Sequence, residues 1–138
     1  MATLQRTVIN PAQAPRPLGA YANAVRVKAG ELVYIAGQVG VDARGNLVGK
    51  GDVQAQTRQI FENLGQVLAS VGASFSNVVE FTTYLVGRES VQPFMAARTE
   101  LFPQLFPKQD YPPNTLLIVS GLVREEFLVE IKAVAALP

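Results

Sequence analysis

Two residue types that this chain lacks limit the chemistry it could perform. The sequence contains no cysteine and no histidine. Without cysteine there can be no disulfide, no thiolate nucleophile and no thiolate-bound metal. Without histidine there can be no Ser-His-Asp triad, no imidazole-bound zinc and no imidazole acid–base catalysis. Proton transfer must therefore use a carboxylate, a tyrosine, a lysine, a backbone group or water, and we expect neither a metal nor a cofactor.

Glu130 is the carboxylate that stands out, because it interrupts an apolar segment near the C-terminus, "EFLVEIKAVAAL". On a strand, Val129 and Ile131 would share one face, and Glu130 would lie on the other between Leu128 and Lys132. The simpler interpretation is a solvent-facing carboxylate paired with Lys132 or a cross-strand neighbour. The alternative is a partly desolvated carboxylate at a subunit boundary, which could hold or activate a water molecule.

Other polar groups lie where predicted elements begin or end. Tyr21 follows a proline-rich passage and would, on its own, be a packing aromatic. Gly37 and Gln38 close the "AGQ" segment at residues 36–38, where the glycine gives backbone freedom and the Gln38 amide could line a polar pocket. Arg98 lies beside the apolar stripe of a predicted helix, so we expect it to be a solvated edge residue. The residues of that stripe are Phe94, Ala97, Leu101 and Leu105.

The stretch "DYPPNTLLIVSGL" places two prolines directly before a predicted strand. Pro112 and Pro113 fix φ and remove two backbone donors, so the chain should stay extended up to Asn114. This construction either initiates the strand or presents the Asn114 side chain rigidly at a pocket.

The order of elements predicted from apolar periodicity is β-β-β-α-β-α-β-β. The helix predicted from residue 52 has Asp52 as its N-cap and Gly72 as its C-terminal stop. The helices are predicted within residues 51–73 and 90–106. The strands are predicted within residues 4–10, 23–40 (a hairpin that turns at Ala29-Gly30), 77–86, 114–122 and 125–137.

Two amphipathic helices can cover only one face of such a sheet. We therefore predict a single α+β domain over residues 1–138, with one mixed sheet and two helices on one face. The other face should be apolar and should need a second subunit. The residues expected on that open face are Val33, Leu117, Val119, Val129 and Ile131.

The composition of the chain limits the classes of partner that we expect. The net charge is +1 with basic residues scattered along the chain, so we expect no nucleic-acid partner. No apolar run approaches the length needed to span a membrane, and the N-terminus lacks an apolar signal core. These features predict a cytoplasmic protein without a membrane partner.

The ordered set of segments resembles the RidA (YjgF/YER057c/UK114) family. The matching segments are "GAY" at 19–21, "LVYIAGQVGVD" at 32–42, "DVQAQTRQIFENLGQVLASVGASFSNVVEFTTYLV" at 52–86 and "VEIKAVA" at 129–135. The resemblance implies a chorismate-mutase-like fold and a homotrimer with a small-molecule cleft between subunits. In its deaminating members, 2-imino or enamine acids are hydrolysed to 2-oxo acids and ammonia. An arginine holds the substrate carboxylate, while a glutamate and backbone groups position water.

By position, the resemblance assigns ligand contact to Tyr21, Gly37 and Gln38 and the catalytic role to Glu130. Three further ligand-binding positions depart from the family pattern. Asn114 stands where deaminating members have the arginine, Ala36 where they commonly have serine, and Met95 where many have asparagine. Losing a charge-assisted contact to a carboxylate costs roughly 1.5–3 kcal/mol.

Arg98 and Arg124 are the candidates by sequence for replacing that arginine. We expect a RidA-like hydrolase or deaminase acting on an imine, an enamine or a related compound, with the usual 2-imino acid activity weakened. The alternative is a non-catalytic trimer that binds a small ligand or regulates a partner. An endoribonuclease is less favoured, because the chain has no histidine pair and no basic groove.

Overall fold

All the predicted helices and strands are present in the computed structural model, which describes residues 3–138. The strands and helices are β1 Gln5–Ile9, β2 Ala24–Lys28, β3 Glu31–Val39, α1 Val53–Ser70, β4 Val78–Val86, α2 Val91–Leu105, β5 Asn114–Val119 and β6 Val129–Leu137. Short 3-10 turns, Phe75–Asn77 and Arg88–Ser90, precede β4 and α2. The predicted α+β class and element order are therefore confirmed.

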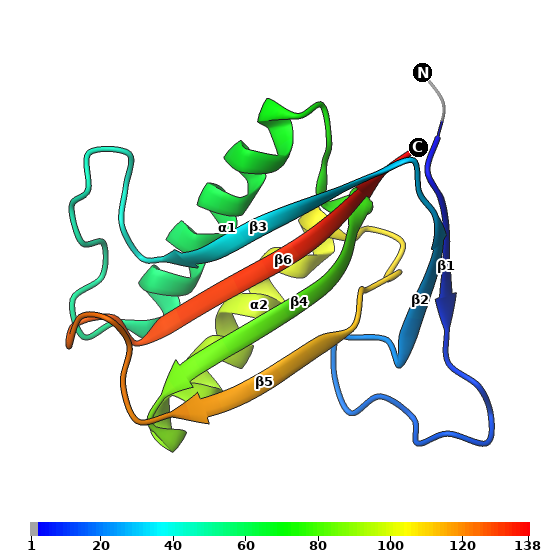
Figure 1. Ribbon diagram of the computed structural model, residues 1–138. Helices are drawn as coiled ribbons and strands as arrows, with labels where there is room; N and C mark the ends of the chain where they lie inside the picture. Colours follow the sequence, from blue (N-terminus) through cyan, green and yellow to red (C-terminus); the bar gives the residue numbers. More distant parts are fainter. Residues whose placement is uncertain (1–2) are drawn as a thin grey trace.

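The strands form two sheets, not the single sheet predicted. A four-stranded sheet has the order β3-β6-β4-β5, with only the β4–β5 pair parallel, and β1 and β2 form a separate antiparallel pair (Figure 1). The predicted β2–β3 hairpin is wrong. Gly30 N donates to the carbonyl of Leu137, the last residue of β6, at 2.9 Å. The chain therefore turns at the end of β6, and β3 pairs with β6 and not with β2.

Helices α1 and α2 lie side by side on one face of the four-stranded sheet (Figure 1). Side chains of the central strands alternate, and those directed at the helices are almost fully buried, including Val129 and Ile131. Val33 pairs with Ala135 on the same face. These three residues were expected on the open face, and that expectation is wrong, because the alternation that exposes Glu130 and Lys132 turns their neighbours toward the helices.

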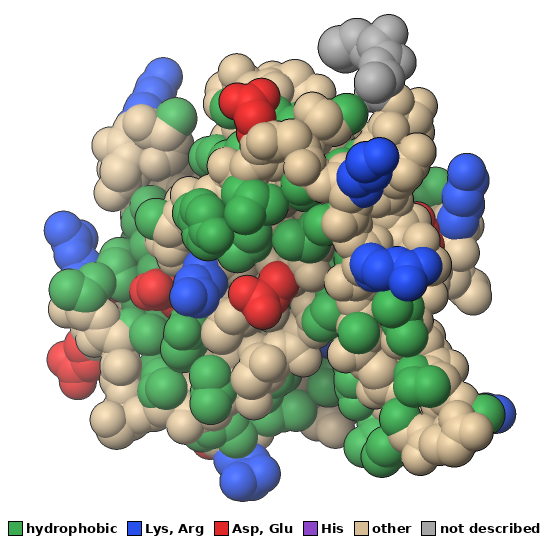
Figure 2. Space-filling view, turned by 45° about the vertical axis from the view of Figure 1, so that its right-hand side comes forward, with side chains coloured by type: hydrophobic (Ala, Val, Ile, Leu, Met, Phe, Trp, Pro, Cys, Tyr) green, Lys and Arg blue, Asp and Glu red, His purple; other side chains and the backbone are tan. Residues whose placement is uncertain are grey.

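The open face of the sheet carries no helix from residues 3–138. Leu32, Tyr34 and Leu117 are exposed large hydrophobic residues on it, and Tyr34 is 75% exposed. Figure 2 shows hydrophobic side chains gathered over this side of the molecule, with single charged side chains between them. An uncovered face of this kind agrees with association between copies, although the trimer itself stays a prediction. No helix within the described residues is long and apolar enough to cross a bilayer.

Helix α1 begins and ends where the sequence indicates. The Asp52 carboxylate accepts a hydrogen bond from Ala55 N at 3.0 Å, which caps the first turn. Gly72 has a φ of +73°, which ends the helical segment shortly after Ser70. The predicted buried stripe of α2 was Phe94, Ala97, Leu101 and Leu105, but the buried residues are Phe94, Ala97, Arg98 and Phe102.

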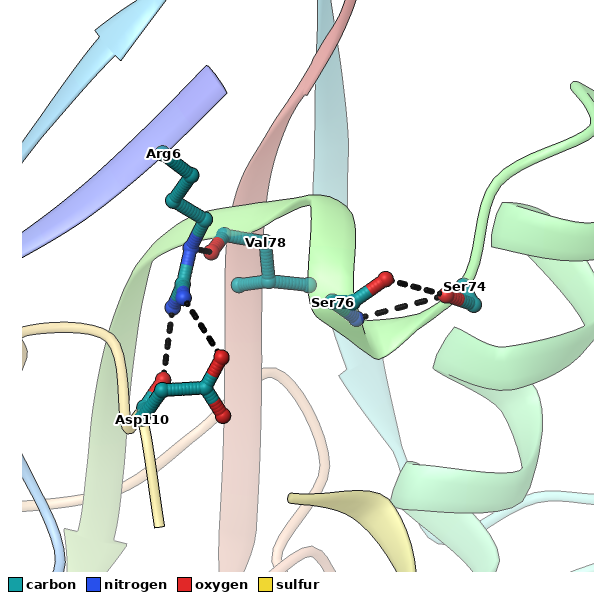
Figure 3. A network of polar contacts seen from close by, with 5 residues as sticks. All are labelled: Arg6, Ser74, Ser76, Val78 and Asp110. Atoms are coloured by element: carbon teal, nitrogen blue, oxygen red, sulfur yellow. Dashed lines mark hydrogen bonds and ion pairs between the residues drawn. The ribbon is translucent and has the colours of Figure 1, made fainter. Parts of the chain in front are cut away.

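Arg6 fastens the β1–β2 pair to the main sheet. Its guanidinium donates to Val78 O at 3.0 Å, to Asp110 O at 3.0 Å and to the Asp110 carboxylate at 3.4 Å (Figure 3). The Arg6 side chain is only 5% exposed. One side chain therefore ties β1 both to the start of β4 and to the loop that leads into β5.

Replacing this clamp should destabilise the protein. Arg6→Gln removes charge-assisted hydrogen bonds to two backbone carbonyls, so we expect the free energy of unfolding to fall by about 2–3 kcal/mol. Urea denaturation at a fixed protein concentration measures the loss. Arg58→Gln is the matched control, because Arg58 makes an exposed ion pair with Glu100 and should cost less than about 1 kcal/mol. Equal effects of the two substitutions would contradict the assignment.

Candidate functional site

A pocket of about 210 Å³ lies between the proline-rich loop, α2 and the start of β5. It brings together Tyr21, Met95 and Asn114, which were predicted as ligand contacts from distant parts of the sequence. The complete lining is Leu18, Gly19, Tyr21, Met95, Arg98, Asn114 and Leu116. The pocket thus has leucine side chains on its walls and a small number of polar groups, as small-molecule sites usually do.

The two prolines before β5 hold Asn114 in place through their carbonyl groups. Pro112 O accepts from Ala22 N at 3.3 Å, and Pro113 O accepts from Phe81 N at 2.9 Å. The first bond also fixes the backbone next to Tyr21. A proline has no N–H to donate but keeps its acceptor, so this loop can be anchored on one side while staying extended.

The Asn114 side chain is oriented by a buried hydroxyl group. Thr83 Oγ1 donates to Asn114 Oδ1 at 2.9 Å. No side-chain hydrogen bond within residues 3–138 uses Asn114 Nδ2, so the amide can donate to a ligand. The Tyr21 hydroxyl accepts from Leu18 N at 3.1 Å, which leaves its own proton free for a ligand.

Arg98 is the charged residue of the pocket, and its burial was not expected from the sequence. It was expected to be a solvated edge residue, but it is only 5% exposed. Its guanidinium carbon lies 5.4 Å from the Phe94 ring centre and 5.9 Å from that of Phe102. Burial lowers the pKa of Arg98, and the nearby hydroxyl groups of Tyr21 and Tyr111 partly oppose this change. An arginine remains protonated under these conditions.

The guanidinium has poor hydrogen-bond partners for a buried cation. Arg98 Nη2 donates to Met95 Sδ at 2.9 Å, and a thioether is a weak acceptor. Among residues 3–138, no Asp or Glu carboxylate forms an ion pair with Arg98. A charge removed from water is costly unless it is paired, so a small anion in the pocket would satisfy an otherwise unpaired group.

Arg124 does not share this environment. Its side chain is 66% exposed, forms an ion pair with Glu126 at 3.9 Å and lies over the Phe127 ring. It is not among the residues that line the pocket. Of the two arginines that could replace the one expected at position 114, only Arg98 lies beside Asn114.

Ala36, Gly37 and Glu130, three of the remaining predicted site residues, form a second cluster on the open face of the sheet. Glu130 on β6 pairs with Val39 on β3 and with Tyr84 on β4. The pairing of β3 with β6 is irregular between Ile35 and Gln38, which is where the predicted Ala36-Gly37-Gln38 segment falls. The Glu130 carboxyl group lies directly over Gly37, so that a Cβ at this position would overlap it.

Gln38 pairs with Ile131, which lies on the helix-covered face, and its side chain folds back on its own strand, where Nε2 donates to Ala36 O at 3.1 Å. Glu130 and Lys132 do not form an ion pair within the described chain, so the simpler interpretation of a paired surface carboxylate lacks its partner. The carboxylate is half-buried and has access to solvent on the open face.

The two clusters lie on opposite faces of one sheet. Asn114 bonds to Thr83, whose side chain shares the helix-covered face with Ile131. Glu130 is opposite Tyr84 on the uncovered face. A single chain therefore does not bring the predicted acid–base residue to the pocket. The spacing of Met95 and Arg98 on α2 was a signal that favoured Arg98 over Arg124, because positions three apart share a helix face.

Comparison with known proteins gives consistent matches along the chain. A family model described as "Endoribonuclease L-PSP" matches residues 11–137. A RutC family protein from Pyrococcus horikoshii is 35% identical over 130 residues, covering 94% of this chain and 97% of the relative. The human protein named 2-iminobutanoate/2-iminopropanoate deaminase is 33% identical over 135 residues, covering 98% of this chain and 93% of the relative.

Solved structures agree with this result. YyfB from Yersinia pestis, described as a protein of unknown function of the conserved Rid family, superposes with a TM-score of 0.85 and 34% identity. The match covers 96% of this chain and 98% of that chain. A protein described as a putative endoribonuclease from Thermotoga maritima superposes with a TM-score of 0.67 and 26% identity, covering 96% and 98% of the two chains.

The contact between Gly37 and Glu130 gives a prediction. Gly37→Ala should displace the Glu130 carboxyl group but lower the free energy of unfolding by less than about 1 kcal/mol, because the atoms that the added methyl group meets belong to a flexible, half-exposed side chain. A crystal structure of the variant, or the carboxyl carbon resonance of Glu130, reports the displacement. Gly121→Ala is the control, since a Cβ there meets no atom within 4 Å. An unmoved Glu130 in Gly37→Ala would contradict the geometry.

Proposed function

The chain belongs to the Rid (YjgF/YER057c/UK114) family, and from that membership we propose that it hydrolyses a small 2-imino or enamine acid whose carboxylate binds Arg98. The observation that carries the proposal is the buried Arg98 guanidinium, which shares a pocket with Asn114 and has no carboxylate partner in residues 3–138. Relatives named 2-iminobutanoate/2-iminopropanoate deaminase support an imine-deaminase role at the level of the family.

Arg98 would restore the charge that is missing at position 114. It approaches the pocket from α2 instead of β5, and its planar fork can bind a carboxylate through two hydrogen bonds. Asn114 Nδ2 and the Tyr21 hydroxyl would add neutral donors beside it. The guanidinium lies over the rings of Phe94 and Phe102, and these contacts limit its motion. Less conformational entropy is therefore lost when a ligand binds.

The proposed reaction consumes one water molecule. Water attacks the imine carbon while Glu130 accepts one of its protons, and that proton passes to the nitrogen to give a carbinolamine. The hydroxyl proton of the carbinolamine is then transferred to the nitrogen as the C–N bond breaks, which gives a 2-oxo acid and ammonia. An enamine acid would first be protonated on carbon to reach the same imine. Arg98 keeps the carboxylate fixed through both steps, so that the imine carbon stays within reach of the water.

The separation of the two clusters makes a neighbouring copy part of the proposal. In one chain, Glu130 lies on the open face of the sheet and Arg98 lies on the helix side. We infer a homotrimer in which the Glu130 cluster of one copy faces the Arg98 pocket of the next. The uncovered hydrophobic residues Leu32, Tyr34 and Leu117 support such an association.

Two other activities remain as test outcomes. Ligand binding without turnover would identify a binding or regulatory protein. The description of the family model names an endoribonuclease, but this chain has no histidine. In addition, the residues that the structure describes contain no group of acidic side chains suited to a metal ion. We therefore favour imine hydrolysis over RNA cleavage.

An arginine transfer tests the role of Arg98. Arg98→Gln should lower kcat/KM for 2-iminobutanoate by about ten- to a hundredfold, because a charge-assisted contact to the carboxylate is lost. Adding Asn114→Arg to that variant should recover part of the activity, since the charge returns to the same pocket from β5. Ammonia release in a coupled assay that generates the imine measures both effects.

The control for this experiment is Arg58→Gln, which removes an exposed arginine on α1 and should leave kcat/KM unchanged. Full activity of Arg98→Gln would exclude a carboxylate contact at this residue. If the parent protein binds the ligand but does not turn over 2-iminobutanoate, the non-catalytic alternative is favoured instead.

Mixing two inactive variants tests whether the site spans subunits. Glu130→Gln should lower kcat by about 10²–10⁴-fold, because the general base is removed. Unfolding and refolding it together with Arg98→Gln should regenerate activity at about one quarter of the intersubunit sites, where an intact Arg98 meets an intact Glu130. Activity of the mixture no higher than that of the separate variants would show that Arg98 of one copy and Glu130 of another do not form one site.

A further inference from the structure

The geometry points to Met95 as an oxidation-sensitive residue whose conversion to the sulfoxide closes the Arg98 anion site. The inference rests on the proposed function for the identity of the ligand, but the contact between Met95 and Arg98 can be measured without any ligand. The modification would make the pocket responsive to peroxide.

Met95 and Arg98 are in direct contact at the pocket wall. Both residues lie on α2, three positions apart, and both line the pocket. The Nη2–Sδ distance is 2.9 Å, and this is the only side-chain hydrogen bond that Arg98 makes within residues 3–138. Any change in the acceptor strength of the sulfur therefore acts on the group that would bind the anion.

The sulfur is also the main oxidisable group of the chain. The sequence has no cysteine and two methionines, Met1 and Met95. No thiol competes for peroxide, so Met95 is the single internal sulfur available. Its side chain is half-buried and faces a pocket large enough for hydrogen peroxide to enter.

The chemical step is a two-electron oxidation by hydrogen peroxide. The Sδ lone pair attacks one peroxide oxygen, an S–O bond forms and the O–O bond breaks. The departing hydroxide takes up the proton left on the transferred oxygen and becomes water. Sulfur is oxidised, peroxide is reduced, and a methionine sulfoxide reductase can reverse the change.

Oxidation changes both the partner and the volume of the anion site. A thioether is a weak acceptor, whereas a sulfoxide oxygen is polar and accepts strongly. The new oxygen would bond to the N–H groups of Arg98 that are otherwise available to a carboxylate, and it would occupy part of the pocket. The backbone at Gly19 passes close to the guanidinium, since a Cβ at this glycine would lie 3.1 Å from Arg98 Nη2.

The experiment compares reduced and peroxide-treated protein with 2-oxobutanoate as the probe. Peptide mass spectrometry follows the gain of one oxygen at Met95, and calorimetry measures the affinity. We expect oxidation to weaken binding about tenfold or more, and methionine sulfoxide reductase to restore it. Met95→Gln, which carries an amide oxygen in a similar place, should bind weakly without any oxidant.

Met95→Leu is the matched variant, and it is compared with itself before and after peroxide. Its affinity should not change on treatment, because leucine cannot be oxidised. A wild-type protein that binds 2-oxobutanoate equally well before and after complete Met95 oxidation would overturn the inference. So would a Met95 that resists peroxide while Met1 is oxidised.

The Arg98 side-chain N–H resonance separates this inference from the proposed function. Loss of the signal in Arg98→Gln assigns it, and oxidation should shift it in the wild type but not in Met95→Leu. If the reduced protein does not bind 2-oxobutanoate through Arg98, the proposed function fails. The resonance then decides the Met95 inference: a shift supports it and an unmoved signal overturns it.

Discussion

The Arg98 guanidinium, which is largely shielded from water and has no carboxylate partner within residues 3–138, is the feature on which the pocket depends. A folded protein keeps such a charge only when the surrounding structure compensates for the lost hydration. Here the compensation comes from the faces of two phenylalanine rings and a thioether, both of which are weaker partners than an anion. A residue that lowers the stability of the fold, and that no other part of the fold requires, is expected at a functional site.

The rest of the fold serves to hold the neighbours of this cation in place. Arg6 connects the β1–β2 pair to the loop before β5, and the carbonyl groups of Pro112 and Pro113 connect that loop to the segment after Tyr21 and to β4. Asn114 therefore begins β5 with its backbone fixed on both sides and its side-chain oxygen bonded to Thr83. The sheet then separates this pocket from Glu130, so that assembly of copies becomes a requirement for the proposed reaction.

The sequence predicted the elements well and their partners less well. Strand β2 was expected to pair with β3 because the two are adjacent in sequence. In the structure β2 pairs with β1, because tertiary contacts at the end of β6 bring β3 to β6. The burial of Arg98 was missed for a related reason. The stripe through Phe94, Ala97 and Leu101 satisfied the helical period, and an arginine beside it is normally solvated. Only the packing of α2 against β4 and β5 turns that position inward. The presence of Tyr21, Met95 and Asn114 in one pocket was available from the family resemblance, not from spacing.

The most direct measurement is a crystal structure of the protein with 2-oxobutanoate, the product expected from 2-iminobutanoate. We expect the ligand carboxylate to lie within hydrogen-bond distance of the Arg98 guanidinium and of Asn114 Nδ2, with the carbonyl carbon directed toward Glu130 of an adjacent copy. A ligand bound with its carboxylate away from Arg98, or bound in a different cleft, would show that Arg98 is not the carboxylate site.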